Sequence, residues 1–216
     1  TLGVNEKFIT GDASDKEKFL QWGKTVPYTL RNPLYHWTHL ELAKYFDIYD
    51  LLNEKSAEAI YEETSAKINS KEYSCQNLLR KVNAKVVCTT EDPTDSLEYH
   101  QQIAKSNLDI KVSTSFRPDK AILIGNEGYN EYVDLLSKVS NIEIITFDDL
   151  CNALHKRIEF FNENGCKVSD HGLEQIYFEE FTESEIQIIF NKKRANQELS
   201  KDEILKFQSA VLIFLS

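Results

Sequence analysis

Charged and polar side chains follow three short apolar runs in the second half of the sequence. The runs lie at residues 85–90, 109–116 and 166–170. Arg117 comes directly after the second run, and the dipeptide Asp170-His171 closes the third. Short β-branched runs of this kind are typical of parallel strands, and reactive groups gather just beyond the carboxyl ends of such strands. We therefore expect any chemistry of this chain to lie at these strand ends.

Arg117 is the most informative of these residues. A guanidinium directly after a buried strand and before Pro118 offers a rigid fork that matches a carboxylate or a phosphate. An ion pair with a neighbouring acid, Asp92 or Asp119, explains the same position equally well. Asp92 itself precedes Pro93 and is interpreted as part of a turn.

Asp170 and His171 could act as a general base or as metal ligands, and Gly172 would let the backbone turn sharply after them. Alternatively, Asp170 caps the next segment and His171 is only hydrogen-bonded. We favour a functional role because the dipeptide ends a predicted buried strand.

Histidines are also candidates in the predicted helices. His36 and His39 are three residues apart and share a helix face, but two histidines without a third ligand are a weak sign of a metal site. We interpret His39 as an interfacial histidine beside Trp37. His100 and His155 are predicted to lie mid-helix at the surface.

The elements that must position these residues fall into two regions. Residues 1–83 read as helices, with a capping box at Ser14 and Glu17 and a cap at Asn32-Pro33. Residues 84–216 alternate three strands with helices, one of them at 95–106, which implies parallel pairing and an α/β fold. Three parallel strands cannot close a barrel, so we expect part of a larger (β/α) array.

Composition narrows the function classes. The chain has 216 residues and a net charge of −10, which argues against nucleic acid or an anionic membrane as a partner. Its four cysteines form no C-x-x-C pair, as expected of a reduced, cytoplasmic protein. The first ten residues lack a basic start and an apolar stretch, so we expect no signal peptide. A glycine-rich phosphate loop and a G-x-S-x-G elbow are both absent.

Four strings together resemble the uronate isomerase family, also called glucuronate isomerase, of the amidohydrolase superfamily. They stand in the family's order and cover essentially the whole chain: TLRNPLYHWTHLEL (29–42), VVCTTEDPTDSLEYH (86–100), FRPDKA (116–121) and SDHGL (169–173). The resemblance implies a distorted (β/α)₈ TIM-type barrel in which residues 1–83 form a helical insertion. It also implies aldose–ketose isomerisation, of D-glucuronate to D-fructuronate and of D-galacturonate to D-tagaturonate, with a bound divalent metal, commonly zinc.

The resemblance also implies roles for individual residues. Arg117 matches an active-site arginine that donates a hydrogen bond to the sugar acid, and His36 matches an active-site histidine on the inserted helices. Asp170 and His171 match a strand-end motif that lines the pocket, and we take them as the catalytic candidates. A homo-oligomer is a further expectation for the full-length enzyme.

Departures from the family pattern are equally informative. The chain contains no H-x-H pair and no Asp-x-Arg, both of which the family's active site requires. We therefore expect barrel strands two to four and the insertion here, with the metal ligands outside this chain and no turnover by the chain alone. Two alternatives stay open: another amidohydrolase that cleaves an amide or ester, and a non-catalytic module that binds a sugar acid.

Overall fold

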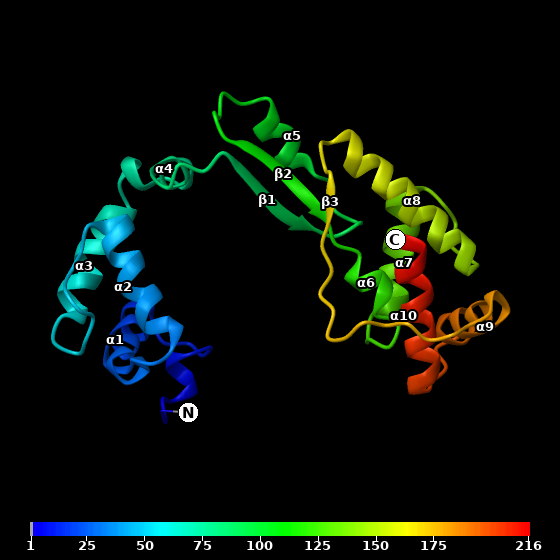
Figure 1. Ribbon diagram of the computed structural model, residues 1–216, viewed down its shortest axis with the longest axis horizontal. Coiled ribbons are helices and arrows are strands. Elements are labelled where there is room, and N and C mark those ends of the chain that lie inside the picture. Colours follow the sequence, from blue (N-terminus) through cyan, green and yellow to red (C-terminus); the bar gives the residue numbers. More distant parts are fainter. Residues whose placement is uncertain (1) are drawn as a thin grey trace. The chain divides into compact units, whose positions relative to one another are not determined.

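The computed structural model describes residues 2–216. The chain forms two compact units, the first ending at Ala84 and the second running from Lys85 to Ser216 (Figure 1). All regular elements in the described part of the first unit are helices. Its elements are η1 (Glu6–Phe8), α1 (Asp15–Thr25), η2 (Val26–Thr29), α2 (Pro33–Phe46), α3 (Ala57–Ile68), η3 (Lys71–Tyr73) and α4 (Cys75–Lys81).

Local capping explains where the helices of the first unit begin. The predicted capping box is confirmed, because Ser14 and Glu17 exchange side-chain and backbone hydrogen bonds at the start of α1. Asn32 caps α2, which has Pro33 at its first position. Gly23 of α1 allows close packing on α3, since a Cβ at this position would lie 2.6 Å from the Cβ of Ala57. The small core of this unit consists of Val26, Leu42, Ile48, Leu52, Ala57 and Ile60.

The second unit alternates strands and helices. Its elements are β1 (Val86–Glu91), α5 (Glu98–Ala104), β2 (Lys111–Phe116), α6 (Asp119–Ile122), α7 (Tyr129–Ser140), α8 (Phe147–Glu163), β3 (Val168–Ser169), α9 (Glu183–Arg194) and α10 (Lys201–Leu215). The three strands pair in the order β1-β2-β3, and both pairings are parallel, as predicted (Figure 1). Thr90 lies opposite Ser115, which lies opposite Val168, so the carboxyl ends of the strands meet at one edge.

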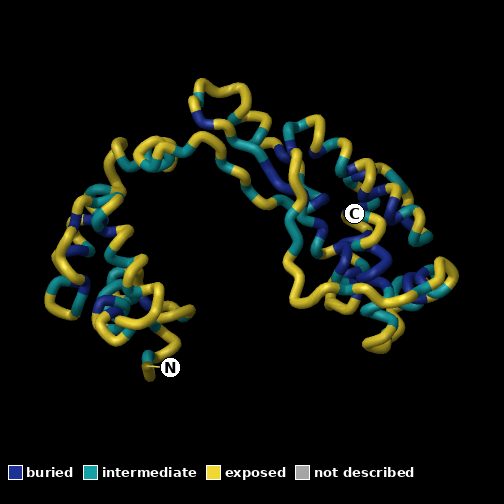
Figure 2. The backbone as a smooth tube through the Cα atoms, in the orientation of Figure 1, coloured by how far each residue is buried: buried dark blue, intermediate teal, exposed yellow. Residues whose placement is uncertain are grey.

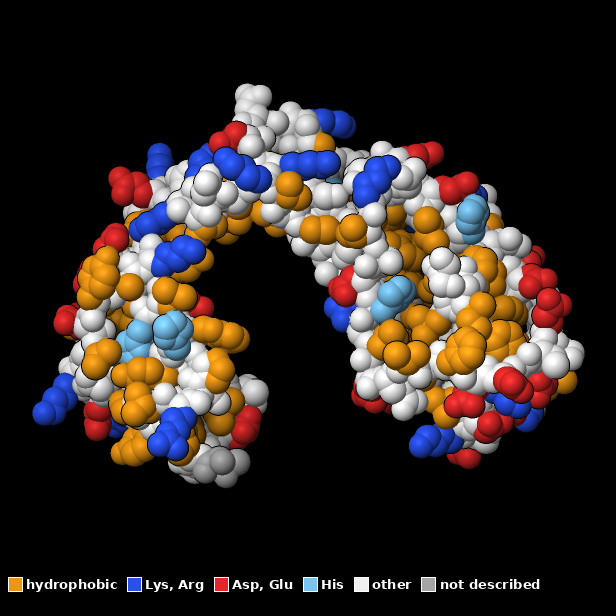
Figure 3. Space-filling model, in the orientation of Figure 1, with side chains coloured by type: hydrophobic (Ala, Val, Ile, Leu, Met, Phe, Trp, Pro, Cys, Tyr) orange, Lys and Arg blue, Asp and Glu red, His pale blue; other side chains and the backbone are white. Residues whose placement is uncertain are grey.

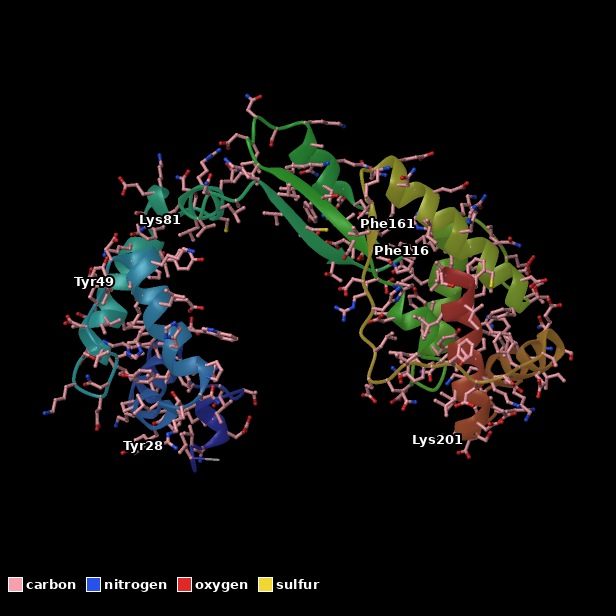
Figure 4. The ribbon with its side chains drawn as sticks, viewed as in Figure 1. Tyr28, Tyr49, Lys81, Phe116, Phe161 and Lys201 are labelled. Carbon is pink, nitrogen blue, oxygen red and sulfur yellow. The ribbon has the colours of Figure 1, made fainter. Side chains whose placement is uncertain are left out.

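The two faces of this sheet differ. On one face Phe116 meets Phe161 of α8 edge to face, with ring centroids 5.1 Å apart (Figure 4). The opposite face carries Val86, Cys88 and Val168, all of which are exposed. Parallel strands are usually buried on both faces. β1 is covered on one face only, because helices of the described residues cover only one side of the sheet. In a (β/α) barrel the uncovered face would line the interior.

The third strand is shorter than predicted. Cys166 lies in the turn that closes α8, where its N–H donates to the carbonyl of Phe161, while Gly165 adopts a positive φ of 90°. Pairing with β2 therefore begins only at Val168 and extends to Asp170, whose N–H donates to the carbonyl of Phe116.

The helix after β1 also begins later than expected, at Glu98 instead of residue 95. Leu97 has a left-handed φ of 57° and is buried, and this turn delays the helix. The carbonyl of Asp95 is bound by a buried arginine from α8, Arg157, which keeps the preceding segment non-helical.

The main core of the second unit lies where α7, α8, α9 and α10 meet (Figure 2). Phe207 of α10 is fully buried among the rings of Tyr129, Phe147 and Phe190. Capping boxes start α9 at Thr182 and α10 at Ser200. Hydrophobic side chains also reach the surface of this unit (Figure 3), among them Val168, Ile176, Phe178, Ile213 and Phe214.

Glu203 should make the stability of the α9–α10 pair depend on pH. Its hydrogen bonds to Lys192 and to the Ser200 N–H lower the pKa of this carboxyl to about 2. A lowered pKa in the folded state stabilises the protein above the ordinary value of 4.5, and that contribution is lost as the pH falls from 4.5 towards 2. Glu203→Gln should therefore lower the free energy of urea unfolding of the full-length protein at pH 7, by an amount that shrinks below pH 4.5. Glu163→Gln, at an exposed carboxylate, is the control.

The isolated 216-residue chain should behave as an incompletely covered domain. One edge of β3 and one face of the sheet lack cover from the described residues, and Val168 and Ile176 are 55% and 90% exposed. We expect strong binding of a hydrophobic dye, a broad thermal transition and self-association in gel filtration. A monodisperse monomer with a sharp, cooperative transition would contradict this expectation.

Candidate functional site

Arg117 lies at the carboxyl end of β2, where its guanidinium contacts two acids. Its Nε donates to Oδ2 of Asp119 at 2.8 Å, and its Nη1 lies 3.6 Å from Oδ2 of Asp170. The hydrogen bond to Asp119 is the main reason that the pKa of Arg117 is raised, and the negative charge of Asp170 adds to it. Of the two acids considered as partners from the sequence, Asp119 forms the ion pair. Asp92 instead accepts hydrogen bonds from Thr94 in the predicted turn.

Asp170 completes a cluster drawn from all three strands. Its backbone is held by the hydrogen bond to Phe116, and its Oδ2 accepts a hydrogen bond of 3.4 Å from Thr90 Oγ1 at the end of β1. The side chains of Arg117 and Asp170 are 40% and 44% exposed, so both can be reached by a ligand. Thr90, Arg117 and Asp170 therefore form a polar strand-end cluster with a donor, a cation and a carboxylate within reach of one small molecule.

Asp119 joins this cluster to the turn after β3. The backbone N–H of Gly172 lies 3.1 Å from Oδ1 and 3.0 Å from Oδ2 of Asp119. The same carboxylate therefore binds the guanidinium of Arg117 and the backbone two residues beyond Asp170.

His171 points elsewhere. It lines a mostly apolar cavity of about 370 Å³ together with Phe116, Phe161 and Leu215, on the side of the sheet that the helices cover. Its Nδ1 is buried and lacks a hydrogen-bond partner among the described residues. Successive residues of an extended chain point to opposite faces, which separates His171 from Asp170. The structure thus brings Asp170 to Arg117 and turns its neighbour towards the helices, and a catalytic role for His171 stays a prediction.

The two histidines of the first unit, His36 and His39, differ in their hydrogen bonding. The N–H of Leu52 donates to Nε2 of His39, so Nδ1 carries the proton and donates to the carbonyl of Tyr35. Both ring nitrogens of His39 are used by backbone groups, and its ring neighbour is Tyr35, not Trp37. His39 therefore has a structural role, but beside Tyr35 and not beside Trp37 as predicted.

His36 is exposed on α2 and leaves its ring open to a ligand. It lies in the first unit, whereas Arg117 and Asp170 lie in the second. The role of His36 as a residue that binds the sugar acid stays a prediction.

His100 is not a surface residue, which corrects the expectation from sequence. Its side chain is 13% exposed, and its Nε2 lies 2.8 Å from Thr89 Oγ1 and 3.7 Å from Glu91 Oε1. Thr89 and Glu91 alternate along one face of β1, the face on which α5 packs. That alternation, together with a histidine on the next helix, is the sequence signal that could have predicted the contact.

Arg157 is a second residue that the sequence did not single out. It is buried, its Nε donates to the carbonyl of Pro93 at 2.6 Å, and its Nη2 donates to the carbonyl of Asp95 at 2.8 Å. The guanidinium also stacks on Phe160, 4.1 Å from the ring centroid. Burial lowers the pKa of Arg157. Arg157 therefore anchors the loop that leaves the strand end of β1.

Within residues 2–216, no group of three or more His, Cys, Asp or Glu side chains is arranged to hold a metal ion. All four cysteines are free thiols. None of the helices that the structure describes has the length and apolar character needed to span a membrane.

Comparison with known proteins identifies the family. Residues 1–216, the whole chain, match the glucuronate isomerase family. The chain belongs to this family. The resemblance inferred from the four sequence strings is thereby confirmed.

Individual relatives agree with this assignment. The chain is 70% identical over its full length to a uronate isomerase of Flavobacterium johnsoniae and 50% identical over 99% of its length to one of Bacteroides thetaiotaomicron. It spans 46% of each of these relatives, so it is about half as long as the curated proteins that it matches.

Solved structures of the family share the fold. A crystal structure of uronate isomerase from Thermotoga maritima superposes with a TM-score of 0.93 at 34% identity, covering 99% of this chain and 47% of that one. A crystal structure of glucuronate isomerase from Caulobacter crescentus is 20% identical and shares the fold with a TM-score of 0.90. The match covers 99% of this chain and 46% of the Caulobacter chain. The predicted α/β fold, part of a TIM-type barrel, is confirmed.

Replacing Arg157 with methionine should loosen the loop between β1 and α5. The substitution leaves the buried carbonyl of Pro93 and the partly buried carbonyl of Asp95 without their charged donor, and a hydrogen bond to a charged group contributes about 1.5–3 kcal/mol. Amide hydrogen exchange of residues 92–97 should become at least about tenfold faster. Mass spectrometry of the full-length protein measures this rate, with the exposed Lys156→Met as the control. Unchanged exchange in that loop would show that other contacts hold it.

Proposed function

We propose that the full-length protein containing this chain is a uronate isomerase, an aldose–ketose isomerase that converts D-glucuronate to D-fructuronate and D-galacturonate to D-tagaturonate. The observation that carries the proposal is the strand-end cluster of Thr90, Arg117 and Asp170 in a chain that matches the glucuronate isomerase family over its whole length. The relatives that are 70% and 50% identical bear the name uronate isomerase, which supports the same activity.

The chemistry of this isomerisation suits the groups in the cluster. The aldose and the ketose differ in the position of hydrogens on two neighbouring carbons, so the reaction needs a group that moves a proton and donors that stabilise an enediol oxygen. Asp170 supplies a carboxylate that can accept a proton. Arg117 supplies N–H donors for a sugar oxygen on which negative charge develops. In this proposal Arg117 and His36 bind the sugar acid. Asp170 and His171 are the candidates for the proton transfer, although the ring of His171 lies on the helix-covered side of the sheet, away from Arg117.

A divalent metal, with zinc as the candidate, belongs to the proposal for the full-length enzyme only. Among residues 2–216 the side chains present do not fit a metal site, because no suitable group of three ligands comes together. The ligands are expected outside this chain, and the roles given above for Arg117 and Asp170 do not depend on them. A homo-oligomer of the full-length enzyme remains a prediction.

The full-length protein should convert glucuronate to fructuronate, whereas residues 1–216 alone should not. Arg117→Met should lower kcat/KM by about 100-fold, the cost of removing one well-placed donor to a developing charge. Arg194→Met, at a partly buried arginine of α9 that is paired with Asp134, is the matched control and should change kcat/KM little. Hydrolysis of an amide or ester without isomerisation would favour a different amidohydrolase. Binding of uronate without turnover would favour a non-catalytic module.

His36→Ala should raise the KM for glucuronate in the same assay, because an exposed imidazole on α2 is lost as a hydrogen-bonding partner of the sugar acid. His155→Ala, on a histidine whose side chain is 66% exposed, is the control. An equal KM for wild type and His36→Ala would show that His36 does not bind the sugar acid. The proposed role of Arg117 would not be affected by that result.

A further inference from the structure

Asp119 occupies an unusual place among the strand-end residues. It is the first residue of α6 and its side chain is only 20% exposed. Its Oδ2 accepts from Arg117 Nε at 2.8 Å, and both of its oxygens lie within 3.1 Å of the Gly172 N–H. A carboxylate has about four acceptor sites, so one side chain can hold both groups at once. The ends of β2 and β3 are thereby joined by Asp119.

The hydrogen bond to Asp119 also decides which edge of the guanidinium is available. Nε is occupied, while Nη1 lies 3.6 Å from Asp170, which is too far for a hydrogen bond. The Nη1 hydrogens are therefore left for a ligand that enters beside Asp170. Because a guanidinium is planar and rigid, holding its Nε in place also sets the direction in which its Nη1 hydrogens point.

Gly172 gives independent evidence that its backbone packs closely against the side chains of Arg117 and Asp119. A Cβ at position 172 would lie 2.7 Å from Nη2 of Arg117 and 2.7 Å from Oδ2 of Asp119. Any larger residue would push the ion pair apart. Both atoms are side-chain ends, so a Cβ at this position would displace the guanidinium and the carboxylate and not the backbone.

We infer that Asp119 is a positioning residue, which aims Arg117 at the sugar acid by holding its guanidinium against the turn after β3. This inference rests on the proposed function for the role of Arg117 in substrate binding. Asp119 touches neither the reacting atoms nor the sugar; it acts through Arg117.

A purely electrostatic role for Asp119 leads to the opposite expectation. One guanidinium here faces two carboxylates, Asp119 and Asp170, so the cluster carries more negative than positive charge. If Asp119 only contributed charge, removing it would favour an anionic substrate and lower the KM. If Asp119 positions Arg117, removing it weakens binding and turnover despite the more favourable charge.

The test compares Asp119→Asn, Gly172→Ala, Arg117→Met and the double variant Arg117→Met/Asp119→Asn in the full-length protein, with glucuronate as substrate. Asp119→Asn and Gly172→Ala should each lower kcat/KM by about 30- to 100-fold, as expected for a misplaced binding group. The double variant should be no worse than Arg117→Met alone, because Asp119 acts through Arg117. Asp202→Asn, on a side chain that is 70% exposed, is the matched control.

A second readout does not need activity. The Arg117 Nε–H resonance, identified by its absence in Arg117→Met, should exchange slowly with solvent in the wild type and quickly in Asp119→Asn. If the wild type does not isomerise uronates, the proposed function fails. The Nε–H resonance still tests whether Asp119 holds the guanidinium of Arg117. A lower KM in Asp119→Asn, additive losses in the double variant, or an unchanged Nε–H exchange rate would each overturn the inference.

Discussion

Parallel backbone pairing of β2 with both of its neighbours is the constraint on which the rest of the second unit depends. Because β1, β2 and β3 run in the same direction and in a defined register, the residues after each strand arrive at one edge. Thr90, Arg117 and Asp170 are far apart in the sequence, yet their side chains meet there. Parallel pairing also requires crossover helices, and α5 and α8 bury one face of the sheet. The crossover helices α7 and α8 also build the core around Phe207, together with α9 and α10, which follow β3.

The difference between the two faces of the sheet explains several features together. The face covered by helices holds Phe116 against Phe161, the hydrogen bond between Thr89 and His100, and the ring of His171. The other face remains open around Val86 and Cys88, which is the side that the interior of a complete barrel would occupy. A chain that covers about half the length of its relatives can thus form a defined cluster at its strand ends while leaving apolar surface exposed.

Residues outside the cluster hold it in place through backbone groups. Arg157 binds two carbonyls of the loop after β1, and Asp119 binds the N–H of Gly172 after β3. In the first unit His39 has the same kind of role, since both of its ring nitrogens are engaged by the backbone of α2 and of the segment at Leu52. A histidine or arginine that satisfies buried backbone groups is structural, and this distinguishes His39 from the exposed His36.

The sequence by itself determined the local features. Capping boxes at Ser14, Thr182 and Ser200, the order of strands and helices, and the family strings were all readable, because each depends on residues close together along the chain. Tertiary structure alone decided which side chains meet. It directed Asp170 towards Arg117 and His171 away from it, placed His100 against β1, and buried Arg157 beneath a loop more than 60 residues away in the sequence. Those outcomes depend on strand register and on how helices pack over the sheet, which involve residues too far apart for local spacing to reveal.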